Sequence, residues 1–74
     1  MLDRETVRAR MAHLLNHPVE KLRDDMALQD LVTDSMILVN MVIELQEDLR
    51  VRLVQQDLKD VRSVGDLLGV FERK

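Results

Sequence analysis

Leu31-Val32-Thr33-Asp34-Ser35-Met36, followed by an apolar run from Ile37 to about Leu49, is the stretch that decides the fold of this 74-residue chain. Asp34 is a favourable helix N-cap and places the Ser35 hydroxyl in the first turn. Unpartnered backbone N–H groups and the positive end of the helix dipole favour a phosphate there. The stretch predicts a helix over 35–49, in which Ser35 is either an attachment point or a capping residue alone.

Length and composition limit the possible functions. A chain of 74 residues forms one domain, expected here over 1–74, with little room for an enclosed active site. Hydrophobic residues make up 46% of the chain and aromatic residues 1%, so Leu, Val, Ile and Met must form the core, which suits helices. Without cysteine there is neither a disulfide framework nor a thiolate metal site, and we expect a cytoplasmic protein.

No membrane segment is expected. Asp3, Arg4 and Glu5 interrupt the N-terminus before a signal peptide could form. The apolar run from Met36 to Val39 ends at Asn40, far short of the roughly 18 apolar residues that span a bilayer. We therefore expect no membrane span.

Charge is distributed unevenly along the chain. Residues 24–49 carry seven acidic side chains and no Lys or Arg, whereas the segments before and after them are net basic. This acidic middle third repels nucleic acid, so no nucleic-acid partner is expected. It either steers basic proteins toward itself or is a solvated helix face.

Two further segments precede the central stretch. Leu2 and Asp3 predict a hydrophobic staple and an N-cap for a first helix over about 3–16, because Asn16 favours a helix end. Residues 17–33 predict a long loop with a helical turn near 19–23. Isolated apolar residues are expected to pin this loop to the core: Val19, Leu22, Met26, Leu28 and Leu31.

The predicted helix over 35–49 is apolar around much of its circumference, so we expect it to lie centrally in a bundle. Its polar stripe consists of Asn40, Glu44, Glu47 and Asp48. Ile37 should flank this stripe, as a docking patch beside Ser35 or as a single exposed apolar residue.

The C-terminal third predicts a connector, a short helix and a last helix. Residues 50–54 alternate like a strand but have no strand to pair with, and residues 56–61 suit one or two helical turns with Leu58 and Val61 inward. Ser63, with Asp66 three residues later, predicts a capped helix. Its apolar stripe is Val64, Leu67, Leu68 and Phe71. The predicted class is all-α, with three main helices and a short third helix.

Enzyme chemistry and metal binding are both disfavoured. His13 and His17 have the spacing of one helix face, but His17 follows the expected helix end and no third ligand is suitably spaced, so we expect two surface histidines and no metal. Ser35 has no histidine nearby in sequence, and Gly-rich phosphate loops are absent. We therefore expect no catalytic residue.

The order of these elements resembles that of acyl carrier proteins, over essentially the whole chain. The matching positions are Leu31-x-x-Asp34-Ser35-Met36, then Val39, Met41, Val42, Leu45, Glu47 and Leu49, then Leu53, Val61 and Val64. The resemblance implies a small four-helix bundle with a long loop between the first two helices. It also implies that a phosphopantetheinyl transferase attaches 4′-phosphopantetheine from coenzyme A to Ser35, with Asp34 as the motif and cap residue.

The same resemblance implies how such a protein works. The thiol of the arm holds an acyl or aminoacyl group as a thioester, which a loading enzyme supplies and downstream synthases consume. The carrier itself, expected as a monomer, catalyses nothing.

Departures from the family pattern indicate how partners dock and which kind of pathway the protein serves. Val32 stands where many members have Gly, and Ile37 and Asn40 stand where acidic residues are usual. We expect partner docking through an apolar start and an acidic end of the helix, formed by Met36, Ile37, Asn40, Glu44 and Glu47. This favours a specialised lipid, polyketide or related biosynthetic pathway.

Two alternatives remain at this point. Asp34-Ser35-Met36 and Glu44-Leu45-Gln46 are also similar to D-alanyl carrier proteins of cell-wall modification, which hold an aminoacyl group. The chain could instead be a helical interaction module, in which Ser35 is only a cap and the apolar helix docks a partner helix.

Overall fold

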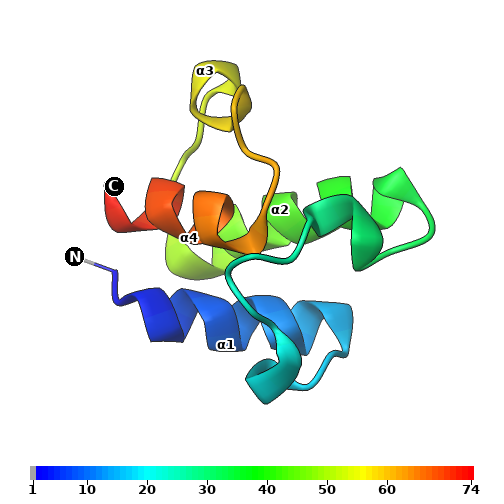
Figure 1. The fold of residues 1–74 in the computed structure, drawn as a ribbon. Coiled ribbons are helices and arrows are strands. Elements are labelled where there is room, and N and C mark those ends of the chain that lie inside the picture. The colour runs from blue at the N-terminus through cyan, green and yellow to red at the C-terminus, as the bar shows by residue number, and fades with distance from the viewer. Residues whose placement is uncertain (1) are drawn as a thin grey trace.

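The computed structural model describes residues 2–74 and contains helices but no strand in that range. The α-helices are α1 (Arg4–Leu15), α2 (Ser35–Leu49), α3 (Gln55–Leu58) and α4 (Val64–Glu72), and two short 3-10 turns are η1 (Val19–Lys21) and η2 (Leu28–Asp30) (Figure 1). The predicted all-α class, with three main helices and a short third, is confirmed. None of the helices in residues 2–74 has both the length and the hydropathy needed to cross a bilayer.

The core lies around α1 and α4 rather than around α2. Helix α1 packs against both α2 and α4, while α3 packs on α4 (Figure 1). Five of the nine residues of α4 are buried, whereas in the 15-residue α2 only Met41 and Leu45 are buried. The prediction of a central α2 is therefore wrong. One side of α2 packs on α1 and η2, and its other side faces solvent.

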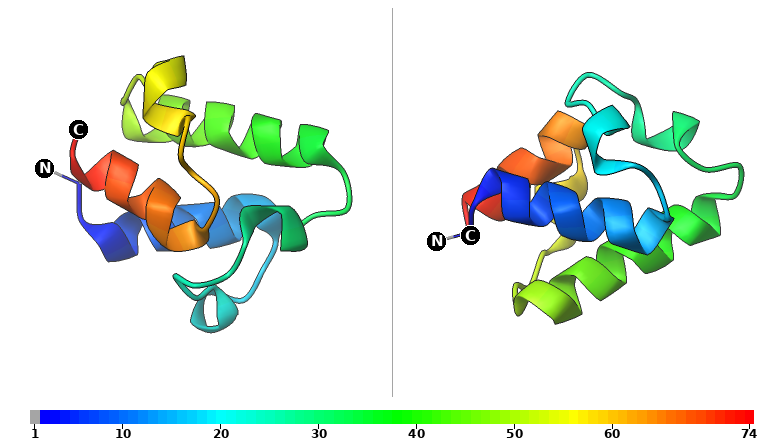
Figure 2. Two further views of the ribbon diagram at one scale, coloured as in Figure 1. Left: turned by 45° about the horizontal axis from the view of Figure 1, so that its top comes forward. Right: turned by 90° about the horizontal axis from the view of Figure 1, so that it is seen from below.

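Both ends of α2 fall where the sequence places them. Asp34 precedes the helix in an extended conformation, and Arg50 ends it in the left-handed region with φ 55°. The Arg50 backbone N–H then reaches the carbonyl groups of Gln46 and Glu47. The start of α2 lies at the end of the molecule opposite the start of α1 and the C-terminus (Figure 2).

Helix α1 has its predicted end and its predicted N-cap residue, but the N-cap side chain makes no capping hydrogen bond. Asn16 adopts the left-handed conformation, with φ 54°, and ends the helix as expected. Asp3 occupies the N-cap position, but its carboxylate accepts no hydrogen bond from a helical N–H. It accepts one from the Thr6 hydroxyl at 3.4 Å instead, so Asp3 is the N-cap residue as predicted but makes no side-chain bond to the helix.

The predicted cap of α4 is present. Ser63 Oγ accepts a hydrogen bond from the Asp66 backbone N–H at 3.1 Å. The Asp66 carboxylate accepts from the backbone N–H groups of Arg62 and Ser63, at 3.1 and 3.2 Å, and these bonds lower the pKa of Asp66. The preceding α3 is shorter than the predicted 56–61 segment, and both Leu58 and Val61 pack against the core as expected.

The loop over 17–33 is more ordered than the sequence indicates. The turn predicted near 19–23 is present as η1, whereas η2 was not predicted. Leu22 and Leu28 are buried anchors, but Val19 is 41% exposed, so its predicted role as an anchor is wrong. The three-residue η1 buries none of its own residues, so it holds Val19 outside the core.

The middle of this loop runs beside the start of α4. Backbone N–H groups of Leu28, Val64 and Gly65 donate to the carbonyl groups of Arg62, Met26 and Asp24, each at 2.9 Å. Gly65 permits this approach, because a Cβ there would lie 3.0 Å from Asp24 Cβ and 3.1 Å from Asp24 O. The loop that leads to Ser35 is thus fixed to α4 by backbone contacts.

Two arginines of α1 hold the same loop. The Asp24 carboxylate contacts Arg4 Nη2 at 2.8 Å and Arg8 Nη2 at 2.5 Å, and Arg8 Nη1 donates to the Leu22 carbonyl at 2.6 Å. Hydrogen bonds from Arg4 and then Arg8 hold the pKa of Asp24 below its usual value. Arg4 also pairs with Glu72 of α4, so one cluster joins α1, the loop and α4.

Candidate functional site

The start of α2 is built by Asp34 and its own backbone. One carboxylate oxygen of Asp34, Oδ1, accepts from the Met36 backbone N–H at 2.9 Å, and the Asp34 carbonyl accepts from the Ile37 N–H at 3.0 Å. Both bonds close the first turn, so the predicted capping role of Asp34 is confirmed. Ser35 follows as the first residue of the helix, with its side chain exposed.

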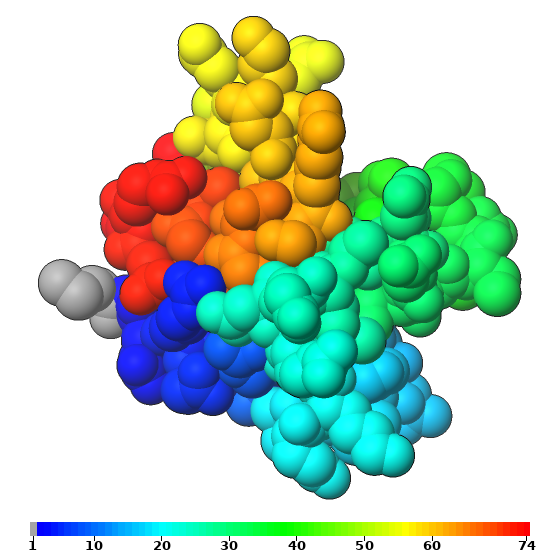
Figure 3. All heavy atoms as spheres, in the orientation of Figure 1, coloured from blue at the N-terminus to red at the C-terminus, as the bar shows by residue number. Residues whose placement is uncertain are grey.

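Ser35 and Ser63 are the two serines of the chain, and they differ in what their hydroxyls do. Ser63 is half-buried, and its Oγ already accepts the Asp66 N–H. Within residues 2–74, the Ser35 hydroxyl makes no hydrogen bond with the protein. Figure 3 shows the start of α2 and the preceding loop projecting from the body of the molecule. A hydroxyl placed there is open to another protein.

The exposed side of α2 carries every docking residue expected from the sequence. Met36 is 58% exposed and Ile37 is 47% exposed, beside the serine. Asn40, Glu44 and Glu47 are also exposed further along the helix. Apolar surface therefore adjoins Ser35, with acidic side chains after it, and we call these five residues the exposed α2 face.

Val39 and Ile43 extend the apolar surface beyond what the sequence predicts. Each is 48% exposed. Because Met41 is buried, residues two positions before and after it lie roughly 200° around the helix axis and must point outward. The helical period relates the positions of Val39 and Ile43 to that of Met41, but it predicts their exposure only once Met41 is known to be buried.

An apolar groove lies between α2 and α3. Its volume is about 270 Å³. It is lined by Leu28, Leu38, Val39, Val42, Ile43, Gln46, Leu58, Val61 and Leu67. Eight of these nine residues are apolar, and the α2 members begin one turn after Ser35. The lining of the groove is thus suited to an aliphatic chain.

Gln46 is the single polar residue of the groove, and sequence reasoning gave it no role. Its Oε1 accepts from the backbone N–H of Leu53 at 2.8 Å, and its Nε2 donates to the Val42 carbonyl at 3.4 Å. The side chain therefore joins α2 to the connector that leads to α3. No local pattern indicates this contact, because Leu53 lies beyond the end of the helix.

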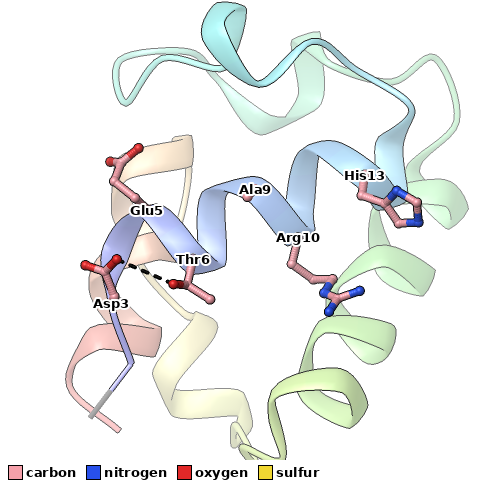
Figure 4. A pocket seen from close by; sticks show the side chains of 6 residues that line it. All are labelled: Asp3, Glu5, Thr6, Ala9, Arg10 and His13. Atoms are coloured by element: carbon pink, nitrogen blue, oxygen red, sulfur yellow. Dashed lines mark hydrogen bonds between the residues drawn. The ribbon is translucent and has the colours of Figure 1, made fainter.

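A second hollow lies along α1 and is separate from the start of α2. Its lining comes from α1 and the residue before it: Asp3, Glu5, Thr6, Ala9, Arg10 and His13 (Figure 4). His13 stands at one end, and His17 does not line the hollow. No group of three potential metal ligands occurs within residues 2–74.

The open hydroxyl of Ser35 fits a covalently attached phosphate group, because the first turn of α2 stays closed by Asp34 without using that hydroxyl. Comparison with known families gives the same kind of chemistry. Residues 5–71 match the family described as phosphopantetheine attachment site. Members of this family bind 4′-phosphopantetheine covalently and are carriers rather than enzymes. The chain belongs to this family and is a non-catalytic, phosphopantetheine-carrying protein with an acyl-carrier-like helical fold.

Proposed function

We propose that Ser35 is the residue that carries 4′-phosphopantetheine and that residues 1–74 act as one carrier domain. The observation that supports this most directly is the contrast between the two serines. The Ser35 hydroxyl is exposed and unused at the head of α2, whereas the Ser63 hydroxyl is half-buried in the cap of α4. A transferase could therefore reach Ser35 without breaking any side-chain hydrogen bond of the carrier.

Asp34 and Ser35 have different roles at this site: Ser35 reacts, and Asp34 caps the helix. Ser35 Oγ forms the new bond to the β-phosphorus of coenzyme A, 3′,5′-ADP leaves, and the serine proton passes to a base of the transferase. Asp34 keeps the Met36 N–H occupied, so the first turn holds its shape throughout. When bound, the arm supplies a thiol that holds the cargo as a thioester.

Mass spectrometry tests the attachment residue. The purified protein is incubated with coenzyme A and a broad-specificity phosphopantetheinyl transferase, and its intact mass is followed. We expect a gain of one phosphopantetheinyl group in the wild type and in Ser63→Ala, and none in Ser35→Ala. Gain in Ser35→Ala, or no gain in a folded wild type, would contradict the proposal.

We further propose that the cargo is an aliphatic acyl group rather than an aminoacyl group such as D-alanyl. The apolar groove supports this, because eight of its nine lining residues are apolar and it begins one turn from Ser35. An alkyl chain there leaves water, which stabilises it by about 0.8 kcal/mol per buried methylene. A charged ammonium group gains nothing from such a lining and loses hydration.

Thioester lifetimes test the cargo class. The transferase loads octanoyl or alanyl groups directly from the corresponding acyl-coenzyme A, and cleavage by hydroxylamine is followed by mass. The octanoyl thioester should be cleaved more slowly on the folded protein than on the same protein in urea, whereas the alanyl thioester should show no such difference. Equal protection of both groups would contradict an aliphatic cargo.

We propose that the enzymes of a specialised lipid, polyketide or related pathway dock on the exposed α2 face. Met36 and Ile37 supply apolar contact beside the serine, while Glu44 and Glu47 supply negative charge further along the helix. A partner enzyme that fits this face has apolar residues around the entrance to its active site and basic residues further from that entrance.

A further inference from the structure

Gln46 stands between the apolar groove and another hollow, at the C-terminal end of α2. This hollow is lined by Ile43, Gln46, Glu47, Arg50, Val51 and Arg52. Ile43 and Gln46 are common to both linings. On one side of the Gln46 amide lies apolar surface, and on the other lie the exposed side chains of Arg50 and Arg52. The amide thus marks the point at which apolar lining gives way to charged surface.

The Gln46 side chain is also held in place. Its hydrogen bonds to the Leu53 N–H and to the Val42 carbonyl use both ends of the amide. Turning it aside would leave the N–H of the buried Leu53 without a partner, at a cost of about 1–3 kcal/mol. It therefore behaves as a fixed wall, unlike the flexible apolar side chains of the groove.

The length of the groove along α2 limits the length of the alkyl chain that it can hold. Of the α2 residues that line it, Leu38 is nearest to Ser35 and Gln46 is farthest. At 1.5 Å per residue they lie roughly 12 Å apart along the axis. An extended alkyl chain with bonds near 1.5 Å covers that length with roughly nine or ten carbons.

We propose that Gln46 ends the groove and sets the longest aliphatic chain that it holds, at medium length. This rests on the proposed function, in which the thiol of the arm on Ser35 carries an acyl group, and on an arm that folds back along α2 so that the thioester lies at the Leu38 end of the groove. A longer chain must displace the amide or bend out past Arg50 and Arg52, where it stays in water. Gln46 is accordingly a specificity-determining residue and takes no part in attachment.

A chain-length series tests the proposal. Wild type, Gln46→Ala and Gln46→Met are loaded from acyl-coenzyme A with straight chains from butanoyl to tetradecanoyl, and the hydroxylamine half-life of each thioester is measured. In the wild type, protection should rise up to octanoyl or decanoyl and fall for dodecanoyl. Gln46→Ala removes the wall, so its maximum should move by about two carbons to longer chains.

Gln46→Met is the matched control, because it keeps the volume of the side chain and loses both hydrogen bonds. A wall held by its hydrogen bonds should give way once they are lost, so the Gln46→Met maximum should lie between those of the wild type and Gln46→Ala. A Gln46→Ala maximum equal to that of the wild type would overturn the proposal. Circular dichroism checks the fold. Should Gln46→Ala fail to fold, Gln46→Asn decides, because it shortens the wall while keeping the amide, and its maximum should also move to longer chains.

Failures of the two proposals are distinguishable in the same samples. Absence of any mass gain from acyl-coenzyme A contradicts attachment at Ser35. A normal mass gain with one chain-length maximum shared by the wild type and the shortened variants contradicts only the role of Gln46.

Discussion

The Asp34 carboxylate accepts a hydrogen bond from the Met36 backbone N–H at 2.9 Å, across the residue that we propose to be modified. The contact completes the first turn of α2 without using the Ser35 hydroxyl. The side chain that shapes the site and the side chain that reacts are therefore different, although they are neighbours in sequence. Substitutions can separate the two roles.

Replacing Asp34 tests its capping role. Asp34→Ala should lower the free energy of unfolding by about 1 kcal/mol, because the Met36 N–H loses its acceptor. Asp34→Asn keeps an acceptor oxygen and should stay close to the wild type. Urea denaturation followed by circular dichroism measures both, and equal losses in the two variants would show that the charge rather than the cap is responsible.

The two glycines of α4 give opposite predictions. A Cβ on Gly65 would lie 3.0 Å from Asp24 Cβ and 3.1 Å from Asp24 O, so Gly65→Ala should destabilise the protein by about 1–3 kcal/mol. A Cβ on Gly69 meets only Arg73 Nη1, at 3.6 Å. Gly69→Ala should therefore stabilise the helix, by up to about 1 kcal/mol. Thermal melts of both variants test this, and a stable Gly65→Ala would refute close packing of the loop on α4.

Asp24 makes part of the stability depend on pH. Its pKa is lowered in the folded state by Arg4 and Arg8. Its contribution to the free energy of unfolding is therefore complete above the pKa of the unfolded state, and it is lost as the pH falls through the lower pKa of the folded state. At pH 7, Asp24→Asn should shift the urea midpoint to lower concentration. Below about pH 4, the difference between the variant and the wild type should shrink toward zero.

The neighbouring Asp25→Asn is the control at pH 7. Asp25 forms an ion pair with Arg23, at 3.4 Å, and both side chains are more than two-thirds exposed, so its urea midpoint should stay near that of the wild type. A difference between Asp24→Asn and the wild type that stays constant down to acid pH would contradict the role given to the Asp24 carboxylate. The effect should be modest, because the Asp24 side chain is 47% exposed.

Ile37 tests the exposed α2 face as a docking surface. Ile37→Glu should raise the KM of the transferase for the carrier several-fold, because it buries a charge against the apolar contact, while leaving the melting temperature nearly unchanged. Val19→Glu is the matched control, since Val19 is 41% exposed but lies on η1. An equal rise in KM for both variants would indicate a general charge effect rather than docking at α2.

The helix ends that are marked by capping residues could be predicted from the sequence. Asp34 and Ser63 are capping residues that act within three positions of themselves, so the starts of α2 and α4 follow from local rules. Asn16 ended α1 for the same reason. The position of Ser35 at the head of a helix, and its exposure, were therefore predictable.

What could not be predicted depends on contacts between distant segments. The choice of Met41 rather than Val39 as a buried residue of α2 depends on where α1 packs, and an apolar helix leaves several sides open to that choice. The Gln46 bond to Leu53 and the contact of Gly65 with Asp24 likewise join segments that no local pattern relates. The groove and its end wall thus required the folded chain.

Peptide mapping of the protein isolated from its own cells tests the central claim most directly. Residues 24–49 contain no Lys or Arg, so trypsin releases Ser35 in the peptide 24–50 and Ser63 in a separate peptide that begins at residue 63. We predict that the phosphopantetheinyl mass is found on the peptide 24–50, with fragment ions that assign it to Ser35 rather than Thr33. The same mass on Ser63 or Thr33, with Ser35 unmodified, would contradict the account.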